Sequence, residues 1–525
     1  MADDWEDENV IRPTLAKRAG VTIPKLRRLV REMAANWESL SPGQDPRIDP
    51  ADRARFLGAW NEHRQLYGYT LLAELPYALR NALRDHPDFE GVDFELLVVD
   101  EYQDLNACDL EVLALLAARG CWIIGAGDDD QSIYSFRKAA PAGIRRFPSD
   151  YPGAADYALS VTQRCGSRIM EWATYVIEGD PDRPRTKARL TSAAGSPPGE
   201  VALLSFAGEV AEAKGIATLI GKLVRTKLIP PNEILVLLRG DYNGTFSKPI
   251  KEHLEEINIP YSDSEAIERL LGEPSNRQML EVFRLLVHRQ DSLAWASLLQ
   301  LTAGIGNSLI DYLYERARTA RVQFGQALLD AYARGFPDGP SGSSKRARTL
   351  VQSVLAWLDS HALPTTEETR WGEWIIKTAG GAVAPSPSDE LAKLLHALDD
   401  LVEPRQGLGR YLGQIGPLGR DLMQAESDGV RIMTMASSKG LTVRAAIVAA
   451  AEEGVIPRPD ADLGEERRLL YVAMTRAKEF VYCTWARRRK GPTARAGLAR
   501  VREIRRYSSF LQGGPVQSED GQGYV

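Results

Sequence analysis

Two adjacent acids follow a short apolar run near residue 100. Asp100 and Glu101 come directly after Leu96–Val99, and Gln103 and Asp104 follow them. An apolar run without polar alternation is typical of a buried strand in a parallel sheet, and such sheets bind ligands at the carboxyl ends of their strands. Adjacent carboxylates at that position suit a hydrated Mg²⁺ ion. Asp100 and Glu101 are therefore candidate metal ligands, and the alternative is a strand that runs into an acidic surface turn.

A second strand candidate lies one helix further along the chain. Apolar residues at three- and four-residue intervals predict a helix over Cys108–Ala118, and Cys121–Ala126 reads as another buried strand. Two strands separated by a helix, each followed by polar residues, indicate a doubly wound nucleotide-binding layout. Gln131 lies just after the second strand, where an amide can sense a terminal phosphate or orient a water.

Two aromatic residues and a basic one come next. Tyr134 and Phe136, with Arg137 beside them, have the residue types of a stacking platform for unpaired bases. The alternative is two core aromatics in a loop, and the residues alone leave both interpretations open.

Composition limits the class of protein. The 525 residues correspond to about three or four domains. The chain has 65 basic and 71 acidic residues, a net charge of −6, so any nucleic-acid surface must be local. The four cysteines show no CxxC spacing, which predicts neither a zinc site nor a disulfide framework and fits a reducing cytoplasm. No uncharged apolar run approaches about 18 residues, so we expect a cytoplasmic protein with no membrane segment.

These motifs together resemble those of a known family. Val99–Asn106 and Gly127–Ala139 are similar to the second and third signature motifs of UvrD/Rep/PcrA helicases, through a DExQD strand end followed by GDxxQSIYxFR. Members of this family are superfamily 1 helicases that move 3′ to 5′ on single-stranded DNA while hydrolysing ATP. The resemblance implies that Asp100 and Glu101 hold Mg²⁺ and polarise the attacking water, and that Gln131 touches the γ-phosphate. It also places Tyr134 and Phe136 along the single-strand track.

Two further segments carry the arginines of the family's nucleotide site. Leu159–Ser167 resembles the LxxNYRS segment, whose arginine corresponds to Arg164 and reaches the γ-phosphate; Gln163 replaces the tyrosine that stacks on adenine in relatives. Glu465–Lys478 resembles the last family motif and is predicted to be helical, with Arg476 as a second γ-phosphate arginine. Guanidinium suits this role because a transferring phosphoryl group carries spread negative charge.

A third segment resembles the family's TxHxxKGLE motif. Within Val430–Leu441, Thr434, Ser437 and Lys439 suit contacts to the DNA backbone, which position the protein without reading sequence. Two residues depart from the family pattern, since Ala436 stands for a histidine and Thr442 for a glutamate that contacts the nucleotide sugar. The DNA-binding candidates are thus Tyr134, Phe136, Arg137, Thr434, Ser437 and Lys439.

The resemblance implies an α/β fold with tandem RecA-like parallel-sheet motor domains. The first is N-terminally incomplete, and a helical accessory domain is inserted in the second. The expected boundaries are 1–90 for the helical insertion of the first motor domain, 91–155 for the C-terminal part of that domain, 156–275 for the first half of the second motor domain, 276–425 for the accessory domain, 426–512 for the second half of the second motor domain, and 513–525 for a flexible tail.

One expected element does not occur in the sequence. A motor of this kind uses GxxxxGK[ST] to cradle phosphates, and the only Gly-Lys pair, Gly221-Lys222, precedes Leu223 inside a predicted helix. The cradle strand would lie beside Cys121–Ala126, so we expect an open apolar sheet edge there, with a covering partner or poor solubility as the result.

Two hypotheses remain from the sequence. The first is a UvrD-like ATP-dependent 3′–5′ DNA helicase or translocase of DNA repair or related metabolism, acting on single-stranded or partly duplex DNA with ATP and Mg²⁺. Its N-terminal P-loop segment would be missing from the chain, through a misplaced start, a frameshift or a second polypeptide. The alternative is an ATPase-inactive, helicase-like module that binds single-stranded DNA or a partner protein.

Overall fold

The computed structural model describes residues 3–86, 88–139, 141–262, 266–364, 369–425, 428–495 and 503–525. The chain divides into two compact units. We call residues 1–79 and 265–426 the helical unit, and residues 80–264 and 427–525 the sheet unit. No helix in the described part of the chain is long and apolar enough to cross a membrane.

Among its described residues, the helical unit contains helices and no strand. Its helices are α1 (Asp4–Glu6), α2 (Arg12–Ala19), α3 (Ile23–Ser39), α4 (Pro50–Tyr67), α12 (Ala266–Gly272), α13 (Pro274–Val287), α14 (Ser292–Leu301), α15 (Asn307–Ala320), α16 (Phe324–Ala333), α17 (Ser341–Ser360), α18 (Trp371–Thr378), α19 (Asp389–Leu398) and α20 (Gly407–Ala425). Helix α5 (Glu74–Asp85) begins in this unit and ends in the sheet unit.

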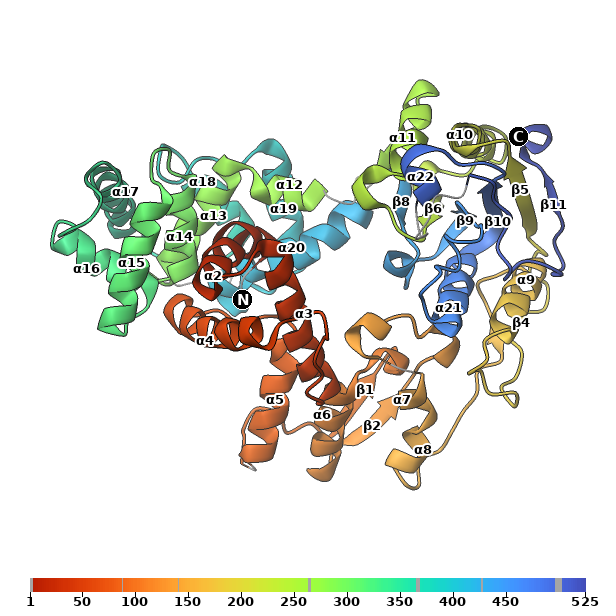
Figure 1. The fold of residues 1–525 in the computed structure, drawn as a ribbon, viewed down its shortest axis with the longest axis horizontal. Helices are drawn as coiled ribbons and strands as arrows, with labels where there is room; N and C mark the ends of the chain where they lie inside the picture. The colour runs from red at the N-terminus through yellow and green to blue at the C-terminus, as the bar shows by residue number, and fades with distance from the viewer. Residues whose placement is uncertain are drawn as a thin grey trace. The chain divides into compact units, whose positions relative to one another are not determined.

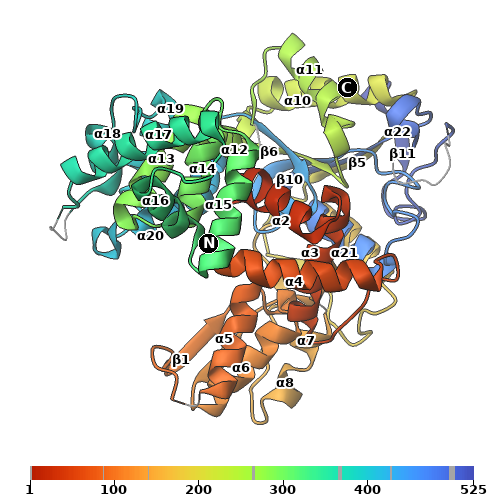
Figure 2. The same cartoon turned by 60° about the vertical axis from the view of Figure 1, so that its left-hand side comes forward.

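Segments far apart in the sequence share one core in the helical unit. Helix α3 buries Leu26, Leu29 and Met33, which recur at helical spacing. These side chains belong to the same hydrophobic cluster as Leu298 and Leu313 from α14 and α15, and Figure 2 shows α2 and α4 beside α15. The structure therefore joins residues 1–79 of the predicted 1–90 insertion and the predicted 276–425 accessory domain in one packed unit, whereas residues 80–90 belong to the sheet unit. The predicted boundary at residue 426 lies outside the described residues.

The sheet unit holds all the strands found among the described residues. Its elements after α5 are β1 (Leu96–Val99), α6 (Ala107–Ala118), β2 (Trp122–Gly125), α7 (Ala142–Arg145), α8 (Phe147–Asp150), β3 (Val161–Thr162), α9 (Ser167–Glu178), β4 (Thr191–Ser192), β5 (Glu200–Phe206), α10 (Glu209–Thr226), β6 (Ile234–Leu238), α11 (Ser247–Glu256), β7 (Tyr261–Ser262), β8 (Val430–Thr434), β9 (Val443–Val448), α21 (Leu463–Met474), β10 (Ala477–Ala486), α22 (Gly491–Arg495), β11 (Ser518–Asp520) and α23 (Gly521–Tyr524).

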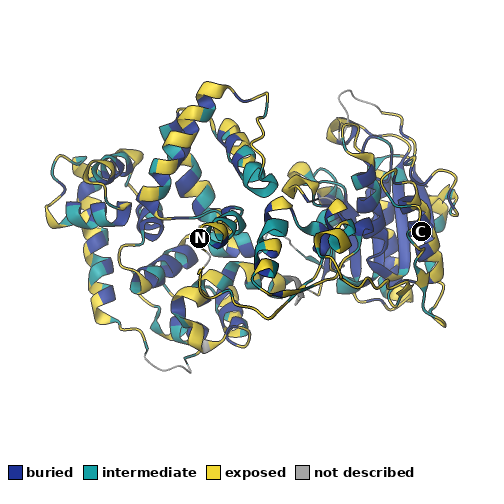
Figure 3. Ribbon diagram, turned by 90° about the horizontal axis from the view of Figure 1, so that it is seen from below, coloured by how far each residue is buried: buried dark blue, intermediate teal, exposed yellow. Residues whose placement is uncertain are grey.

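A seven-stranded sheet forms the core of this unit. Its strand order is β11-β5-β10-β9-β6-β8-β7, and every recorded pairing is parallel. Strand β5 is apolar on both faces, because Val201 and Leu203 enter one hydrophobic cluster and Ala202 and Leu204 enter the other. Helices α9 and α21 pack in the first cluster and α10 and α11 in the second (Figure 1). The interior strands β5, β6, β9 and β10 are accordingly among the most deeply buried parts of the unit (Figure 3).

The strand that carries Asp100 lies in a separate, two-stranded sheet. β1 pairs with β2 in parallel, with Leu96 opposite Trp122 and Val98 opposite Ile124. These four side chains are 52%, 78%, 63% and 53% exposed, respectively. Because register partners point to the same face, they form one exposed apolar face. The prediction of buried interior strands is therefore wrong for this face of both strands, although the parallel pairing agrees with the expected layout.

Two further expectations differ from the structure, one for the C-terminal tail and one for the end of a predicted helix. Residues 513–525 were expected to be a flexible tail, but β11 pairs with β5 and α23 follows it, so this expectation is wrong for Ser518–Tyr524. The helix predicted over Glu465–Lys478 ends at Met474. Arg476 therefore lies between α21 and β10, where its direction is not set by helical spacing.

Candidate functional site

The adjacent carboxylates lie at the carboxyl end of β1. Asp100 is exposed, and its Oδ1 accepts a hydrogen bond from the backbone N–H of Glu101 at 2.8 Å. Glu101 has a φ of +52°, an uncommon backbone conformation for a residue with a side chain. Its carboxylate is 45% exposed and accepts from Gln103 Nε2 at 2.5 Å. The two accessible carboxylates fit Mg²⁺, which binds through one or two such groups and keeps several waters.

Gln131 lies close to one of the predicted phosphate-binding arginines. Its Nε2 donates to Asp128 Oδ2 at 2.9 Å, which leaves Oε1 to accept from Arg476 Nη2 at 3.3 Å. Gln131 follows β2, whereas Arg476 precedes β10, so the contact joins two segments that are 345 residues apart. The structure thus brings these two predicted site residues together.

Arg164 and Arg476 form a pair of like charges. Burial and the neighbouring positive charge of Arg164 lower the pKa of Arg476 to about 10. Arg476 is 1% exposed, and its guanidinium donates to the carbonyls of Val472 and Leu441. Arg164 Nη1 lies 3.4 Å from the Thr475 carbonyl. Neither guanidinium pairs with a carboxylate in the part of the chain that the structure describes, so together they suit a multiply charged anion.

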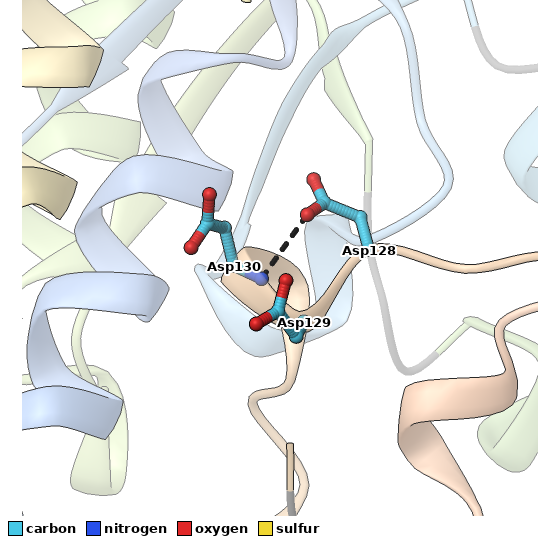
Figure 4. A group of neighbouring side chains, drawn as sticks. All are labelled: Asp128, Asp129 and Asp130. Atoms are coloured by element: carbon cyan, nitrogen blue, oxygen red, sulfur yellow. Dashed lines mark hydrogen bonds between the residues drawn. The ribbon is translucent and has the colours of Figure 1, made fainter. Parts of the chain in front are cut away.

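Three neighbouring acids precede Gln131, and basic side chains already neutralise them. Carboxylate oxygens of Asp128, Asp129 and Asp130 lie within 4.8 Å of one another (Figure 4). Lys187 Nζ contacts all three, at 2.6 Å from Asp128 Oδ1, 2.9 Å from Asp130 Oδ2 and also beside Asp129. Two arginines complete the cluster, since Arg145 pairs with Asp129 and Arg183 with Asp130.

Burial and the neighbouring cations oppose each other at Asp129 and Asp130, and the pKa values of these two acids shift in opposite directions. Burial raises the pKa of Asp129, but the neighbouring Lys187 and Arg145 outweigh it and hold the pKa below its usual range. At Asp130 burial wins over Lys187, and the pKa is raised. Because Lys187 lies where a divalent cation would bind, the cluster is an internal ion network that fixes the loop before Gln131.

Of the two predicted base-stacking residues, Phe136 extends toward solvent and Tyr134 is half-buried. Phe136 is 69% exposed, and its ring meets that of Tyr134 edge to face with centroids 5.6 Å apart. Arg137 is also exposed. The next residue, Lys138, has a φ of +59°, an uncommon backbone conformation for a residue with a side chain. The arrangement offers exposed aromatic and basic groups next to each other, as single-strand binding requires.

The three residues predicted to contact the DNA backbone, Thr434, Ser437 and Lys439, do not lie together in the structure. Thr434 Oγ1 and Ser437 Oγ lie 2.7 Å apart near the surface. Lys439 instead turns inward, with a side chain that is 5% exposed. Its ammonium lies 2.6 Å from Asp104 Oδ2, 2.9 Å from the Gln131 carbonyl and 3.2 Å from Glu101 Oε2. Lys439 thus contacts the carboxylate site, while Thr434 and Ser437 remain at the surface.

Sequence reasoning missed the residues that hold the two halves of the site together. Lys187 and Arg183 lie in a proline-containing stretch without regular spacing, more than fifty residues from the acids they pair with. Arg468 Nε donates to the Ser132 carbonyl at 2.7 Å, and Glu465 accepts from the backbone and hydroxyl of Ser135. Only the excess of charge in these stretches could have indicated them.

Two regions of the chain match known helicase domain families. Residues 50–152 match the UvrD/REP helicase N-terminal domain, and residues 384–488 match the UvrD-like helicase C-terminal domain. Glu101, Gln131 and Tyr134 lie in the first region, and Thr434, Lys439 and Arg476 lie in the second.

Curated relatives give the same result. The chain is 26% identical over 417 residues to the ATP-dependent DNA helicase Rep of Buchnera aphidicola, a match that covers 74% of this chain and 62% of that protein. It is 27% identical over 428 residues to DNA helicase II of Escherichia coli, covering 76% and 56%. The match to ATP-dependent DNA helicase srs2 of Schizosaccharomyces pombe is 24% over 414 residues, covering 74% and 46%. The match thus spans from under half to about three fifths of each relative's length, and the chain is similar to the UvrD/Rep helicase family in both an N-terminal and a C-terminal region.

Proposed function

We propose that the chain provides the greater part of a UvrD-like ATP-dependent DNA helicase or translocase that moves 3′ to 5′ in DNA repair or related DNA metabolism. The observation that carries this proposal is the pair of neighbouring cations Arg164 and Arg476, which have no carboxylate partner among the described residues, with Arg476 hydrogen-bonded to Gln131. Similarity to UvrD/Rep helicases in two regions supports the same conclusion.

Each site residue has a distinct role in this proposal. Arg164 and Arg476 bind the terminal phosphate of ATP and neutralise the charge that develops as the phosphoryl group transfers. Gln131, held by Asp128, is oriented toward that phosphate. Glu101 accepts the proton of the attacking water, and Asp100 and Glu101 would hold a Mg²⁺ ion, which supplies further charge neutralisation when bound. Tyr134 and Phe136 stack on unpaired bases, and Arg137, Thr434 and Ser437 contact the backbone.

The phosphate cradle is the part that these residues do not provide. GxxxxGK[ST] does not occur in the 525 residues, and its backbone N–H groups have no evident replacement in the motifs described above. We propose that hydrolysis requires a cradle from a further segment or a second polypeptide. The absence of this motif also favours a second candidate function, a module that binds single-stranded DNA or a partner protein without hydrolysing ATP.

Parallel measurements on the full chain separate these functions. Anisotropy of a labelled single-stranded oligonucleotide reports DNA binding, and phosphate release reports hydrolysis with and without that oligonucleotide. DNA-stimulated release that Glu101→Gln abolishes establishes the ATPase and shows that the chain needs no separate cradle. DNA binding without release supports the binding module or the need for a cradle, and addition of a P-loop segment from a relative then decides between them. Failure to bind single-stranded DNA contradicts the helicase proposal and leaves only the module that binds a partner protein.

A further inference from the structure

Lys187 is connected to the candidate phosphate site through a single acid, Asp128. The Lys187 ammonium donates to Asp128 Oδ1 at 2.6 Å, and the other oxygen of that carboxylate accepts from Gln131 Nε2 at 2.9 Å. The Asp130 N–H also donates to Oδ1, at 3.1 Å (Figure 4). The Asp128 carboxylate thus has a cation at one oxygen and the Gln131 amide at the other.

The contact with Asp128 determines which way the Gln131 amide points. A carboxylate only accepts hydrogen bonds, so the amide must turn its Nε2 toward Asp128. Its Oε1 then faces Arg476 Nη2 at 3.3 Å. In the reversed orientation Oε1 would meet the carboxylate and Nε2 would meet the guanidinium, so both contacts would be repulsive. The second N–H of Nε2 has no acceptor among the described residues and is left for a phosphate oxygen.

Lys187 keeps its positive charge beside Asp128. Burial lowers the pKa of Lys187, but the neighbouring Asp128 and Asp130 outweigh burial and raise the pKa above its usual value. The Lys187 side chain is 24% exposed, so solvent screens this charge only in part. A lasting cation at Oδ1 sets the direction of the carboxylate, and with it the direction in which Oδ2 meets Gln131.

The backbone around Gln131 is also held by contacts that do not involve Lys187. The Asp128 N–H donates to Gln103 Oε1 at 2.9 Å, and the Gln131 N–H donates to the Asp128 carbonyl at 2.9 Å. The Gln131 carbonyl accepts from Lys439 Nζ at 2.9 Å. Without the Lys187 ammonium the loop keeps these anchors, whereas the Asp128 side chain loses the contact that sets its direction.

We propose that Lys187 is a positioning residue that sets the selectivity of the site for a terminal phosphate. It acts through Asp128, whose carboxylate orients the Gln131 amide so that Oε1 supports Arg476 and an N–H faces the phosphate. The inference rests on the proposed function, in which Gln131 and Arg476 bind that phosphate. Because ADP lacks the terminal phosphate, the orientation of Gln131 should affect the binding of ATP and leave the binding of ADP unchanged.

Calorimetry of the full chain with ATP and with ADP, in the presence of Mg²⁺, tests this inference. Lys187→Met removes the ammonium, and Asp128→Asn places an amide nitrogen where Gln131 needs an acceptor. In both variants the preference for ATP over ADP should fall about fivefold, the effect of one hydrogen bond. Asp128→Asn leaves Lys187 paired with Asp129 and Asp130, so it tests the same contact where Lys187→Met fails to fold.

Two comparisons distinguish positioning from support of the fold. Arg183→Gln removes another cation of the cluster, one that pairs with Asp130 and not with Asp128. It should lower the thermal stability and keep the preference for ATP. In the second comparison Lys187→Met is combined with Gln131→Ala, because residues that act through one contact are not additive. Gln131→Ala alone should lower the preference, and the added Lys187→Met should lower it no further.

The outcomes separate this inference from the function on which it rests. If the unmodified chain prefers ATP and either folded variant, Lys187→Met or Asp128→Asn, keeps that preference, the positioning role is wrong and the phosphate site stands. An additive loss in the double variant, or an equal loss in Arg183→Gln, assigns the effect to the cluster as a whole and also overturns the inference. If the unmodified chain binds ATP no more tightly than ADP, or binds neither, the proposed phosphate site fails and the inference fails with it.

Discussion

The guanidinium of Arg476 lies 3.3 Å from Oε1 of Gln131, and no carboxylate among the described residues neutralises it. Arg164 adds a second positive charge close enough to lower the pKa of Arg476. Folding thus holds two buried or half-buried cations against each other, an arrangement that costs free energy until an anion binds between them. Such a cost is typical of sites that are organised for a ligand.

Replacing Arg476 should separate stability from function. In Arg476→Met the buried positive charge and its repulsion with Arg164 disappear. We therefore expect the free energy of unfolding without nucleotide to rise by about 0.5–2 kcal/mol. Any hydrolysis should fall about a thousandfold, the lower range for loss of a phosphate-stabilising arginine. Calorimetry and phosphate release measure the two effects. A large loss of stability would instead show that Arg476 serves mainly to hold the fold.

Lys187 should be essential to the three-acid cluster. In Lys187→Ala, Asp128, Asp129 and Asp130 lose their shared counter-ion, and we expect a loss of about 3–5 kcal/mol in the free energy of unfolding. The same variant should gain a Mn²⁺ site, because three carboxylates with oxygens within 4.8 Å then lack a central cation. Arg189→Ala removes an exposed pair with Glu178 and should change stability by less than about 1 kcal/mol. Unchanged stability and no Mn²⁺ binding would count against the cluster as described.

The helical unit should lose stability as the pH rises from 4.5 to 7. Burial, together with the nearby Glu281 carboxylate, raises the pKa of Glu6 from 4.5 to about 7 despite Arg284. Between these values the folded chain keeps a proton that the unfolded chain releases, so the stabilisation present below pH 4.5 is lost toward pH 7, by about 1–3 kcal/mol. Calorimetry of Glu6→Gln should show this dependence removed, whereas Glu8→Gln, an exposed control, should retain it. A pH profile that Glu6→Gln does not alter contradicts this assignment.

The exposed face of β1 and β2 should promote association. Leu96, Val98, Trp122 and Ile124 are all more than half exposed on one face of a two-stranded sheet, and contiguous apolar surface of this kind is typical of contact sites. We expect the chain to self-associate with rising concentration, and Val98→Lys to shift it toward monomer in sedimentation velocity runs. Leu228→Lys, at an isolated exposed leucine, is the matched control. A chain that stays monomeric at high concentration would show that this face is tolerated in solution.

Some features of the fold follow directly from the sequence, and others depend on distant partners. Ile234–Leu238 is apolar at every position. This pattern predicts a strand that is buried on both faces, and the structure has such a strand there. Leu96–Val99 has the same pattern but is half exposed, because burial of a strand depends on what packs against it. Local residues thus predict the strand but not its environment.

The site shows the same limit. Gln131 and Arg476 lie in contact in the structure, in agreement with the resemblance. Their chemical roles remain predictions. Lys439 follows Ser437 by two residues, and spacing alone assigns both to the same surface. The intervening turn instead directs Lys439 toward Glu101 and Asp104. Lys187 shows no spacing signal, since its partners are more than fifty residues away and no periodicity connects them.

The central claim is that Gln131, Arg164 and Arg476 recognise the terminal phosphate of a nucleotide. The most direct test compares the affinities of the full chain for ATP and ADP by calorimetry, with Arg476→Gln alongside. We predict that the unmodified chain binds ATP more than about tenfold tighter than ADP, as charge-assisted hydrogen bonds to one further phosphate would give, and that the ratio falls toward one in the variant. Equal affinities for ATP and ADP in the unmodified chain, or a preference that Arg476→Gln leaves intact, would contradict the claim.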